Sequence, residues 1–477
     1  MFRCLRIGNY KISFYESESN VKLKKIVINL FLGCSFFYLQ ADFDPHRDVL
    51  VSSSPNPPRE GNGGKIQIWD PLTFEKALEF ACQVRETYQD PFHLSYFYDS
   101  VSDTYKILTN VGSRFNIYTV GSDEVITSDQ RRESLINTFG LVQFDLQTTV
   151  LVGDRDGYVS EYGIDGSVIR QFSGCQSLPN SYGITCFAMY CDDKSSTILF
   201  SGSCDGTVYA RKYDENEDFV NCFSPGQAVT SLAVFKDETG VNVIAGTSGL
   251  VEEGYPVGQL VCWNVDQKKE LYRVAYDSSG FNSQHQGEQQ WGFVNGLILV
   301  QDQPDYLKLV TIANDSGIKI WDAQTGVCMQ TLVPDGESQD TRNWVMDIKP
   351  FRKNETLYLV AAYYSGDVLF WNTKTGACEA CSSLGQSKTG RTLPRAIVIF
   401  ERDEKLYACA SGDSQNIVTW ELDTFKVVAQ VQGNNNSEWC LATNQQAFGK
   451  GPKVQISHDS SPGLGYRVPI FNLQMKL

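Results

Sequence analysis

Short segments in which apolar and polar residues alternate recur along the chain, and four of them close on Trp followed by Asp or Asn. These four, GKIQIWD, GQLVCWN, GIKIWD and GDVLFWN, begin at Gly64, Gly258, Gly317 and Gly366. A period of two predicts a β-strand with alternating faces, and the glycine at the start of each segment predicts a turn. The pattern therefore predicts one kind of strand, repeated at intervals.

Four weaker copies fill the gaps between the clear ones. They read RFNIYTV, GYVSEYG, GTVYARK and NIVTWEL, and begin at Arg114, Gly157, Gly206 and Asn416. The closing positions of all eight copies are 69, 118, 162, 211, 263, 321, 371 and 420, so successive copies are 44 to 58 residues apart. Such a spacing, built from short strands, is typical of a β-propeller in which each repeat forms one blade.

Each repeat divides into four strands. In the sixth repeat they are predicted at 291–300, 307–313, 318–322 and 327–333. Eight such units cover residues 33–432, and no linker or second domain interrupts them. We therefore expect an all-β chain that forms a single propeller domain over 1–477, with eight complete four-stranded blades.

The two ends of the chain supply further strands. Residues 1–32 are expected to contain closing strands, and 433–477 to form a closing blade or a tail, with strands at 438–443, 453–459 and 466–473. The apolar run 26–40 is expected to be the innermost strand of the first blade; a signal or anchor segment is the alternative, although the run is too short to span a bilayer as a helix. Because an open ring leaves unpaired sheet edges, a ninth blade built from both termini remains possible beside an eight-bladed ring with a tail.

The repeats resemble the WD40 family. Two copies carry its Trp-Asp pair, at Trp69 and Trp321, and two carry Trp-Asn, at Trp263 and Trp371. None of the four histidines follows a glycine, so the family's Gly-His pair is absent and its buried His–Asp network must be missing or replaced. The resemblance implies a non-catalytic scaffold for protein–protein interaction, a subunit of a larger intracellular complex.

Composition narrows the classes of partner. A net charge of −15 argues against a surface that tracks nucleic-acid phosphates, since such proteins gather Lys and Arg on one face. The 14 cysteines are spread thinly without zinc-finger spacing, which favours free thiols in a reducing, cytoplasmic or other intracellular compartment. We expect other proteins as partners, without direct nucleic-acid binding, membrane insertion or a small-molecule substrate.

No catalytic motif is recognisable in the sequence. It contains no GxSxG, P-loop, dinucleotide fingerprint or HExxH motif. The aspartates that can be placed, Asp156, Asp205 and Asp315, fall in turns before third strands. We therefore expect no enzyme activity, cofactor or metal. The alternatives are a propeller enzyme with an acidic central channel, glycoside hydrolase-like or quinoprotein-like, and a reader of a peptide or small ligand at the central mouth.

The longest insertions are predicted to emerge on one face, which we call the top face. They occupy 53–64, 250–256, 278–290, 334–343 and 385–394. Because loops on a rigid scaffold carry variation and binding, this face is where we expect contact with partners.

Aromatic residues recur near the predicted starts of innermost strands, at Phe139, Tyr182, Trp291, Trp344 and Trp439. They are expected to line the rim of the top mouth, either as a binding hot spot or as packing between blades. The predicted partner-binding residues are Trp291, Trp344, Trp439, Phe281, Tyr255, Arg342, Arg391 and Arg395.

Overall fold

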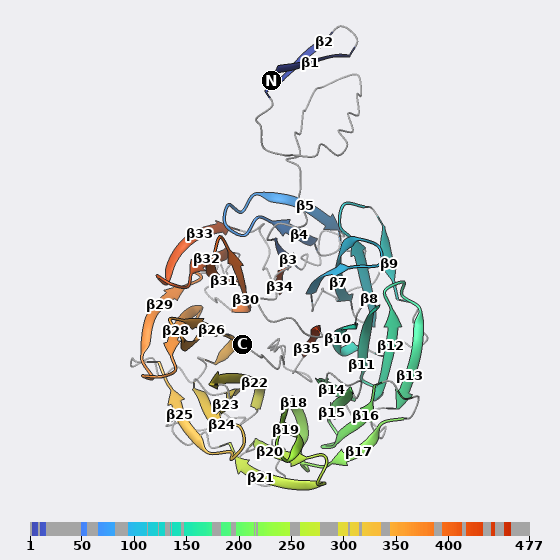
Figure 1. Cartoon of the computed structure of the whole chain (residues 1–477), viewed down its shortest axis with the longest axis vertical. Coiled ribbons are helices and arrows are strands. Elements are labelled where there is room, and N and C mark those ends of the chain that lie inside the picture. Colours follow the sequence, from blue (N-terminus) through green and yellow to red (C-terminus); the bar gives the residue numbers. More distant parts are fainter. Residues whose placement is uncertain are drawn as a thin grey trace, which may run out of the picture. The chain divides into compact units, whose positions relative to one another are not determined.

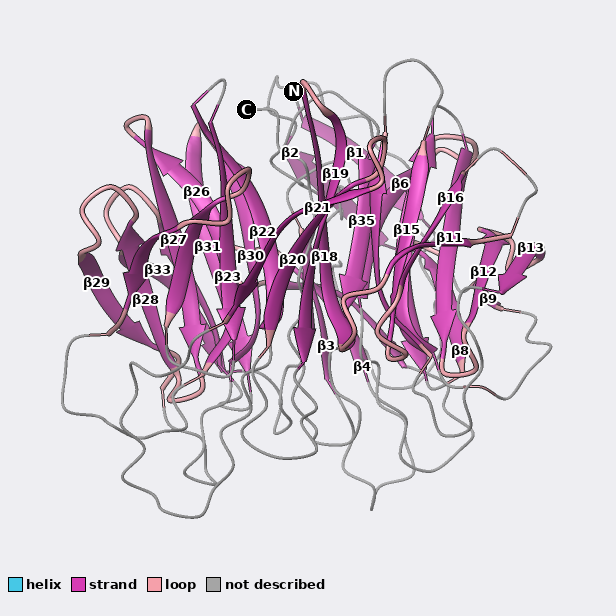
Figure 2. Ribbon diagram, turned by 90° about the horizontal axis from the view of Figure 1, so that it is seen from below, coloured by secondary structure: helices cyan, strands magenta, loops and turns pink. Residues whose placement is uncertain are grey.

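The computed structural model describes most of the predicted strands and the tight turns between them. The described residues are 2–7, 10–15, 49–54, 65–81, 94–111, 113–122, 124–128, 134, 136–144, 147–173, 183–191, 197–213, 215, 218–248, 258–276, 294–303, 306–313, 317–334, 344–385, 394–412, 416–432, 440–443 and 453–458. Within these ranges every regular element is a strand (Figure 2).

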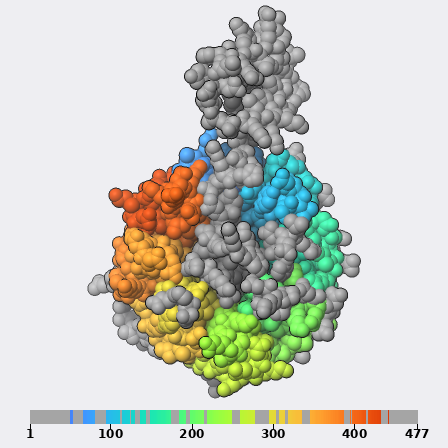
Figure 3. All heavy atoms as spheres, viewed as in Figure 1, coloured from blue at the N-terminus to red at the C-terminus, as the bar shows by residue number. Residues whose placement is uncertain are grey.

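The chain divides into two units, residues 1–42 and residues 43–477. In the first unit, β1 (Phe2–Ile7) pairs antiparallel with β2 (Tyr10–Tyr15), with Phe2 opposite Tyr15. The second unit is an eight-bladed β-propeller, as the repeats predict (Figures 1 and 3).

The blades follow one another in sequence order, and the first strand named in each blade is the one nearest the ring axis. Blade 1 contains β34 (Cys440–Thr443), β3 (Leu50–Ser54), β4 (Lys65–Trp69) and β5 (Lys76–Ala81). Blade 2 contains β6 (Leu94–Asp99), β7 (Thr104–Val111), β8 (Arg114–Thr119) and β9 (Val125–Thr127). Blade 3 contains β35 (Lys453–His458), β10 (Ile136–Phe144), β11 (Gln147–Asp154), β12 (Tyr158–Gly163) and β13 (Val168–Ser173). Blade 4 contains β14 (Ile184–Tyr190), β15 (Ile198–Ser203), β16 (Val208–Lys212) and β17 (Val220–Phe223).

The remaining four blades repeat the same arrangement. Blade 5 contains β18 (Ala228–Asp237), β19 (Gly240–Ser248), β20 (Gln259–Asn264) and β21 (Lys269–Ala275). Blade 6 contains β22 (Val294–Gln303), β23 (Tyr306–Ala313), β24 (Ile318–Asp322) and β25 (Cys328–Leu332). Blade 7 contains β26 (Val345–Lys353), β27 (Thr356–Tyr363), β28 (Asp367–Asn372) and β29 (Cys378–Ser383). Blade 8 contains β30 (Pro394–Arg402), β31 (Lys405–Gly412), β32 (Asn416–Glu421) and β33 (Lys426–Gln432).

The ring closes within blade 1, which combines strands from distant parts of the chain. β34 pairs with β3, with Leu50 opposite Thr443, and so occupies the innermost position of that blade. The prediction that 26–40 provides this strand is wrong; those residues lie outside the described part of the chain. β35 adds to the inner edge of β10 in blade 3, so the described C-terminal strands join existing blades and the described residues form eight blades. Strand pairing of the two ends removes the open edge, and local sequence does not specify which distant segment supplies it.

Blade 8 also binds blade 1 through polar contacts. Arg402 Nη1 and Nη2 donate to the two carboxylate oxygens of Asp70 at 3.1 and 3.0 Å. Thr419 Oγ1 donates to the carbonyl of Pro71 at 3.0 Å. These contacts join residues more than 300 positions apart, so they hold the junction at which the chain closes the ring.

The core lies between blades, because alternate residues of a strand face opposite neighbours. Ile318 and Ile320 of β24 pack against blade 7, in a cluster with Val345 and Ile348. Trp321 of the same strand packs in the cluster between blades 5 and 6. The third strand therefore contributes to the cores on both sides of its blade.

The Asp or Asn after the closing tryptophan forms the turn into the fourth strand. Asp322 Oδ1 accepts from the amides of Gln324 and Thr325 at 3.0 and 2.8 Å. Gly326 then takes a φ of 71°, a left-handed conformation that favours glycine, and its amide donates to Asp322 O at 2.9 Å. Asp70 and Asn372 make the same turn. The repeated dipeptide is therefore explained by packing and turn formation.

In blades 3 to 8, the strands β10, β14, β18, β22, β26 and β30 each carry a β-bulge near their start, and the bulged residues of the first three bond to the next blade. Asn137 Nδ2 donates to Ile184 O at 3.1 Å. Thr185 Oγ1 lies 2.6 Å from Val229 O, and Thr230 Oγ1 lies 2.5 Å from Val294 O. Each acceptor is the residue just before the next bulge. We call these three contacts the bulge clasps, and they link blades 3, 4, 5 and 6 in series.

Within a blade, the closing tryptophan bonds a hydroxyl on the second strand where both groups are present. Trp69 Nε1 donates to Ser52 Oγ and Trp321 Nε1 to Thr311 Oγ1, each at 2.9 Å. In blade 4 the position of the tryptophan is taken by Arg211, and the hydroxyl of Ser201 is buried without a hydrogen-bond partner in the described part of the chain. Blade 7 shows the reverse, since Ala361 stands where the hydroxyl would be and the described residues offer Trp371 Nε1 no acceptor.

Ser52 and Ser201 therefore form a matched pair, equally buried at equivalent positions. Ser52→Ala should lower the free energy of unfolding by about 1–2 kcal/mol, because it leaves the Trp69 indole N–H without its acceptor. Ser201→Ala should leave stability unchanged or raise it, since it removes an unsatisfied hydroxyl. Chemical denaturation of the two variants measures this, and equal losses in both would contradict the assignment.

The blade 8–blade 1 junction should respond to acid. Burial alone raises the pKa of Asp70, but Arg402 and the amides of Thr73 and Leu72 outweigh it and lower the pKa to about 2. A carboxyl with a depressed folded-state pKa contributes stability above its unfolded pKa, and loses it as pH falls through about 2. Arg402→Gln should therefore destabilise the protein by roughly 1–2 kcal/mol at neutral pH and by less below pH 3.

The melting temperatures of wild type and Arg402→Gln, compared from neutral pH to below pH 3, measure this. Lys212→Gln is the control, because it removes an ion pair with Glu215 in which both side chains are largely exposed. A loss in Arg402→Gln that does not shrink in acid would contradict the Asp70 assignment.

Candidate functional site

The top face is the one on which second strands end and third strands begin. Because the sheets are antiparallel, fourth strands also end there and the next blade begins. The five long insertions that define this face lie mainly outside the described residues, whereas the strands and tight turns that flank them are described. The candidate site is built from those flanking residues.

Of the eight predicted partner-binding residues, the structure describes the side chain of one. Trp344 lies immediately before β26 on the top face of blade 7 and is half-buried. Arg395 is the bulged residue of β30; the structure describes its backbone but not its side chain. The others lie outside the described residues: Trp291, Trp439, Phe281, Tyr255, Arg342 and Arg391.

The prediction that the recurring aromatics share one rim position is wrong for Phe139. This residue lies inside β10, opposite Val152, and is 1% exposed in the core cluster between blades 2 and 3. Trp344, by contrast, precedes its strand. Alternation within β10 directs Phe139 into the core between the blades. For this residue the alternative, packing between blades, is correct.

Trp344 forms an aromatic pair with Tyr364. Their ring centroids are 5.7 Å apart with an interplanar angle of 61°, an edge-to-face arrangement, and both side chains are half-buried. The amide of Tyr364 donates to Trp344 O at 2.7 Å, which fixes the two main chains. Large rings presented from a fixed backbone can bury much apolar area without losing much conformational entropy.

Blade 4 has an equivalent main-chain hydrogen bond but lacks the two aromatic side chains of blade 7. There the amide of Cys204 donates to Gly183 O at 3.0 Å. The geometry is thus common to two blades, but blade 4 places glycine and cysteine where blade 7 places two aromatic rings. The backbone geometry therefore does not require aromatic rings at these two positions. We call Trp344 and Tyr364 the blade 7 aromatic pair.

Below this pair, a buried carboxylate joins blades 7 and 8. Asp347 accepts from Lys349 Nζ and the amide of Ile348 at 2.8 Å each, and from the amide of Ile397 in blade 8 at 2.7 Å. Burial raises the pKa of Asp347, against the opposing effect of Lys349 and the two amides. The carboxylate bonds to groups on both blades and so positions them relative to each other.

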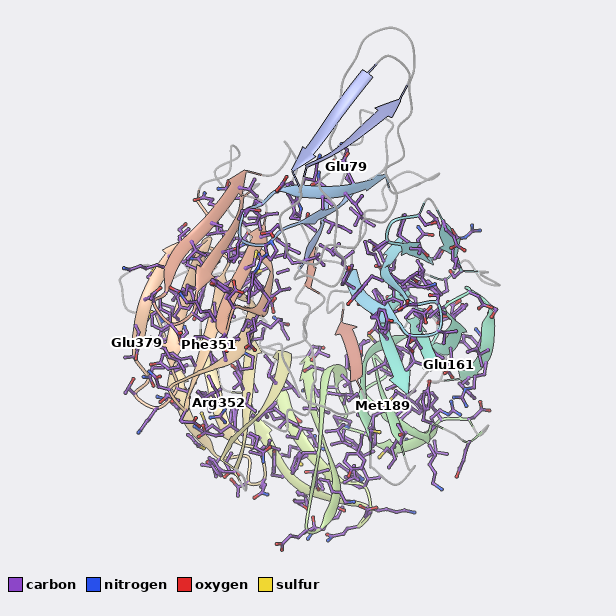
Figure 4. All side chains as sticks on the ribbon, turned by 45° about the horizontal axis from the view of Figure 1, so that its top comes forward. Glu79, Glu161, Met189, Phe351, Arg352 and Glu379 are labelled. Carbon is purple, nitrogen blue, oxygen red and sulfur yellow. The ribbon has the colours of Figure 1, made fainter. Side chains whose placement is uncertain are left out.

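A second buried network joins blades 3 and 4 through Glu161, whose place in blade 3 is labelled in Figure 4. Glu161 forms an ion pair with Arg170 and accepts a hydrogen bond from Tyr213 Oη, which lies 2.9 Å from Thr149 Oγ1. The Arg211 guanidinium lies over the Phe172 ring at 3.5 Å from its centroid, and burial lowers the pKa of Arg211 to about 10. The network binds four strands together.

Neither a metal-binding cluster nor a membrane-spanning helix occurs in the described part of the chain. Among those residues, no group of three or more His, Cys, Asp or Glu side chains could hold a metal ion. No described helix is long and apolar enough to cross a membrane.

Sequence reasoning missed Tyr364. The available signal was its position in the turn between the second and third strands of blade 7, where a small or polar residue is usual. Of the three aspartates that were placed in such turns, Asp205 stabilises its turn, because its Oδ1 accepts from the amide of Thr207 at 2.8 Å. Asp315 lies outside the described residues.

No family model matches the sequence, and no curated protein does. Several solved structures resemble it in fold. The computationally designed protein Ika8 is 18% identical, with 82% of this chain and 98% of that chain covered and a TM-score of 0.50. Sqt1 of Saccharomyces cerevisiae is 11% identical, with 78% and 94% covered and a TM-score of 0.53. NirN, a dihydro-heme d1 dehydrogenase in complex with DHE, is 12% identical, with 84% and 75% covered and a TM-score of 0.56. At these identities the likeness concerns fold alone, and the fold is an eight-bladed all-β propeller.

Proposed function

We propose that this protein is a non-catalytic, divergent WD40-type scaffold that binds other proteins through its top face. The observation that carries the proposal is the blade 7 aromatic pair, two half-buried rings held 5.7 Å apart at the edge of a rigid blade. Tyr and Trp are enriched among residues that dominate binding energy at protein interfaces. The repeated Trp-Asp and Trp-Asn turns support the WD40 relationship.

The buried carboxylates of blades 3 and 7 support a scaffold rather than a reaction centre. Asp347 and Glu161 both bond to groups on a neighbouring blade. A ring tied in this way presents preformed surfaces and loses little entropy when it binds. We further propose a reducing intracellular location; buried thiols without disulfides at Cys186, Cys262 and Cys409 support it.

The test compares wild type with a Trp344→Ala, Tyr364→Ala double variant. Partners recovered by affinity purification from the native source are identified by mass spectrometry, then titrated with both proteins. The double variant should bind more weakly by roughly 2 kcal/mol or more, because it removes the anchoring rings. Its melting temperature should stay close to that of wild type, because both side chains are only half-buried.

Val220→Ala is the control, since this side chain is 63% exposed on an outer strand away from the top mouth. It should bind like wild type. If the double variant instead melts far below wild type and still retains its partners, the rings are core residues and the proposal fails.

A further inference from the structure

Two cysteines of blade 7, Cys378 and Cys381, occupy the outer strand β29 and lie on the same side of their blade. In a regular strand, residues three positions apart face opposite sides. Here Cys378 lies opposite Trp371 and Cys381 opposite Leu369, because the register shifts between them. Trp371 and Leu369 both pack in the core cluster between blades 6 and 7, and opposite residues share a face, so both cysteines are on the blade 6 side.

The extra residue of this bulge is Glu379, which is labelled in Figure 4. Its Oε1 accepts from Tyr358 Oη at 2.9 Å and from Asn372 Nδ2 at 2.7 Å. Tyr358 belongs to the core cluster between blades 7 and 8, so Glu379 is held on the side away from the two cysteines. These bonds fix the bulge, and the bulge sets the positions of the thiols.

Blade 6 has the same bulge and shows how close two side chains at these positions come. Cys328 lies opposite Trp321, and Thr331, three residues later, lies opposite Lys319. Cys328 Sγ is 4.0 Å from Thr331 Oγ1. Since the register is the same in both blades, the two sulfur atoms of blade 7 are expected at a similar separation.

In blade 7, both thiols are within reach of solvent and of each other. Cys381 is exposed and Cys378 is half-buried, and neither forms a disulfide. Burial raises the pKa of Cys381, and Asp367 and Cys378 raise it further, so the two cysteines are close enough to interact. An ion in solution can therefore reach both.

The separation of the sulfur atoms favours a bound metal ion over a disulfide. A disulfide needs Cβ atoms about 3.5–4.5 Å apart, whereas neighbours on one face of a strand are roughly 6.6 Å apart. Two thiolates that each bind a metal ion at about 2.3 Å hold their sulfur atoms roughly 3.8–4.6 Å apart, depending on the bond angle. The 4.0 Å separation in blade 6 falls in this range.

The number of ligands selects the class of ion. Cys378 and Cys381 are the only cysteines of the sequence with CxxC spacing, so the four ligands of a structural zinc site are not supplied. That spacing is the reason why the sequence led us to expect no metal. Thiolates prefer soft ions, and monovalent copper is satisfied by two thiolates in a near-linear arrangement.

We propose that Cys378 and Cys381 form a binding site for monovalent copper on the outer strand of blade 7. Each thiol loses its proton on binding, so one ion replaces two protons and the occupied site carries one negative charge. Asp367 opposes that charge, so the affinity comes from the copper–sulfur bonds. Cys378 Sγ donates to Ala380 O at 3.2 Å, and the metal ion takes the place of the proton in that hydrogen bond. The inference goes beyond the proposed function, because it involves no protein partner.

The test titrates the full, reduced chain with Cu(I) without oxygen, in competition with bicinchoninate, a coloured Cu(I) chelator. Wild type should withdraw copper from the chelator. Cys378→Ser and Cys381→Ser should each weaken this binding by more than roughly 100-fold, the upper end of the cost of losing an outer-shell partner, because each removes a ligand itself. Iodoacetamide labelling followed by mass spectrometry should show that bound Cu(I) protects Cys381 from alkylation.

Cys328→Ser is the matched control, because Cys328 is exposed at the equivalent position of blade 6 but has Thr331 beside it instead of a second thiol. It should bind copper as wild type does. Thr331→Cys is the converse change, since it completes a cysteine pair at the bulge of blade 6. This variant should take up a further equivalent of copper.

Copper affinity that is unchanged in Cys378→Ser or Cys381→Ser, an equal loss in Cys328→Ser, or alkylation of Cys381 that copper does not slow would each overturn the inference. So would a Thr331→Cys variant that takes up no further copper, because the argument rests on the geometry of this bulge. The Trp344→Ala, Tyr364→Ala variant separates this result from the proposed function. It should bind copper as wild type does, whatever its effect on protein partners.

Discussion

The ring depends on hydrogen bonds that cross from the bulged strand of one blade to the bulged strand of the next. Thr185 and Thr230 each lie at a bulge, where the extra residue turns its hydroxyl toward the carbonyl just before the following bulge. Asn137 makes the same contact from blade 3, and Asp347 reaches the amide of Ile397 from blade 7. Apolar packing alone is tolerant of sliding between sheets, whereas these directed bonds fix the offset of adjacent blades near the axis. They connect blades in a chain that carries no Gly-His pair.

The hydrogen bond between the closing tryptophan and the second strand varies from blade to blade, because not every repeat retains both the indole and the hydroxyl. Blades 1 and 6 keep the bond between indole and hydroxyl, while blade 4 has only the hydroxyl of Ser201 and blade 7 only the indole of Trp371. At the other end of the strands, Arg352 of blade 7 donates to the carbonyls of Gln301 and Asp302 in blade 6 (Figure 4). Several hydrogen bonds between and within the blades are partly redundant, so the fold tolerates the loss of any one of them. This explains how such degenerate repeats still form one ring.

Much of the fold could be predicted because the alternation of apolar and polar residues and the spacing of the repeats are local features of the sequence. Alternation located β24 and β28, the Trp-Asp and Trp-Asn pairs located the turns after them, and the spacing gave the blades. Closure by β34 could not be predicted, because Cys440–Thr443 has no local feature that distinguishes pairing with β3 from forming a further blade. For the site, Trp344 was expected as a rim aromatic, but Tyr364 and the bulge of β29 depend on pairings that only the fold creates. Phe139 was misplaced because periodicity near a bulge does not fix which face a residue takes.

The bulge clasps hold the blades in register, and Thr→Val substitutions at Thr185 and Thr230 test this most directly. Valine keeps the shape of threonine but has no hydroxyl. Thr185→Val and Thr230→Val should each lower the free energy of unfolding in chemical denaturation by about 1–2 kcal/mol, since each leaves a main-chain carbonyl without its donor. Thr331→Val, at an exposed position on the outer strand β25, should be neutral. If the two clasp variants are as stable as Thr331→Val, the innermost strands are held by packing alone and the account is wrong.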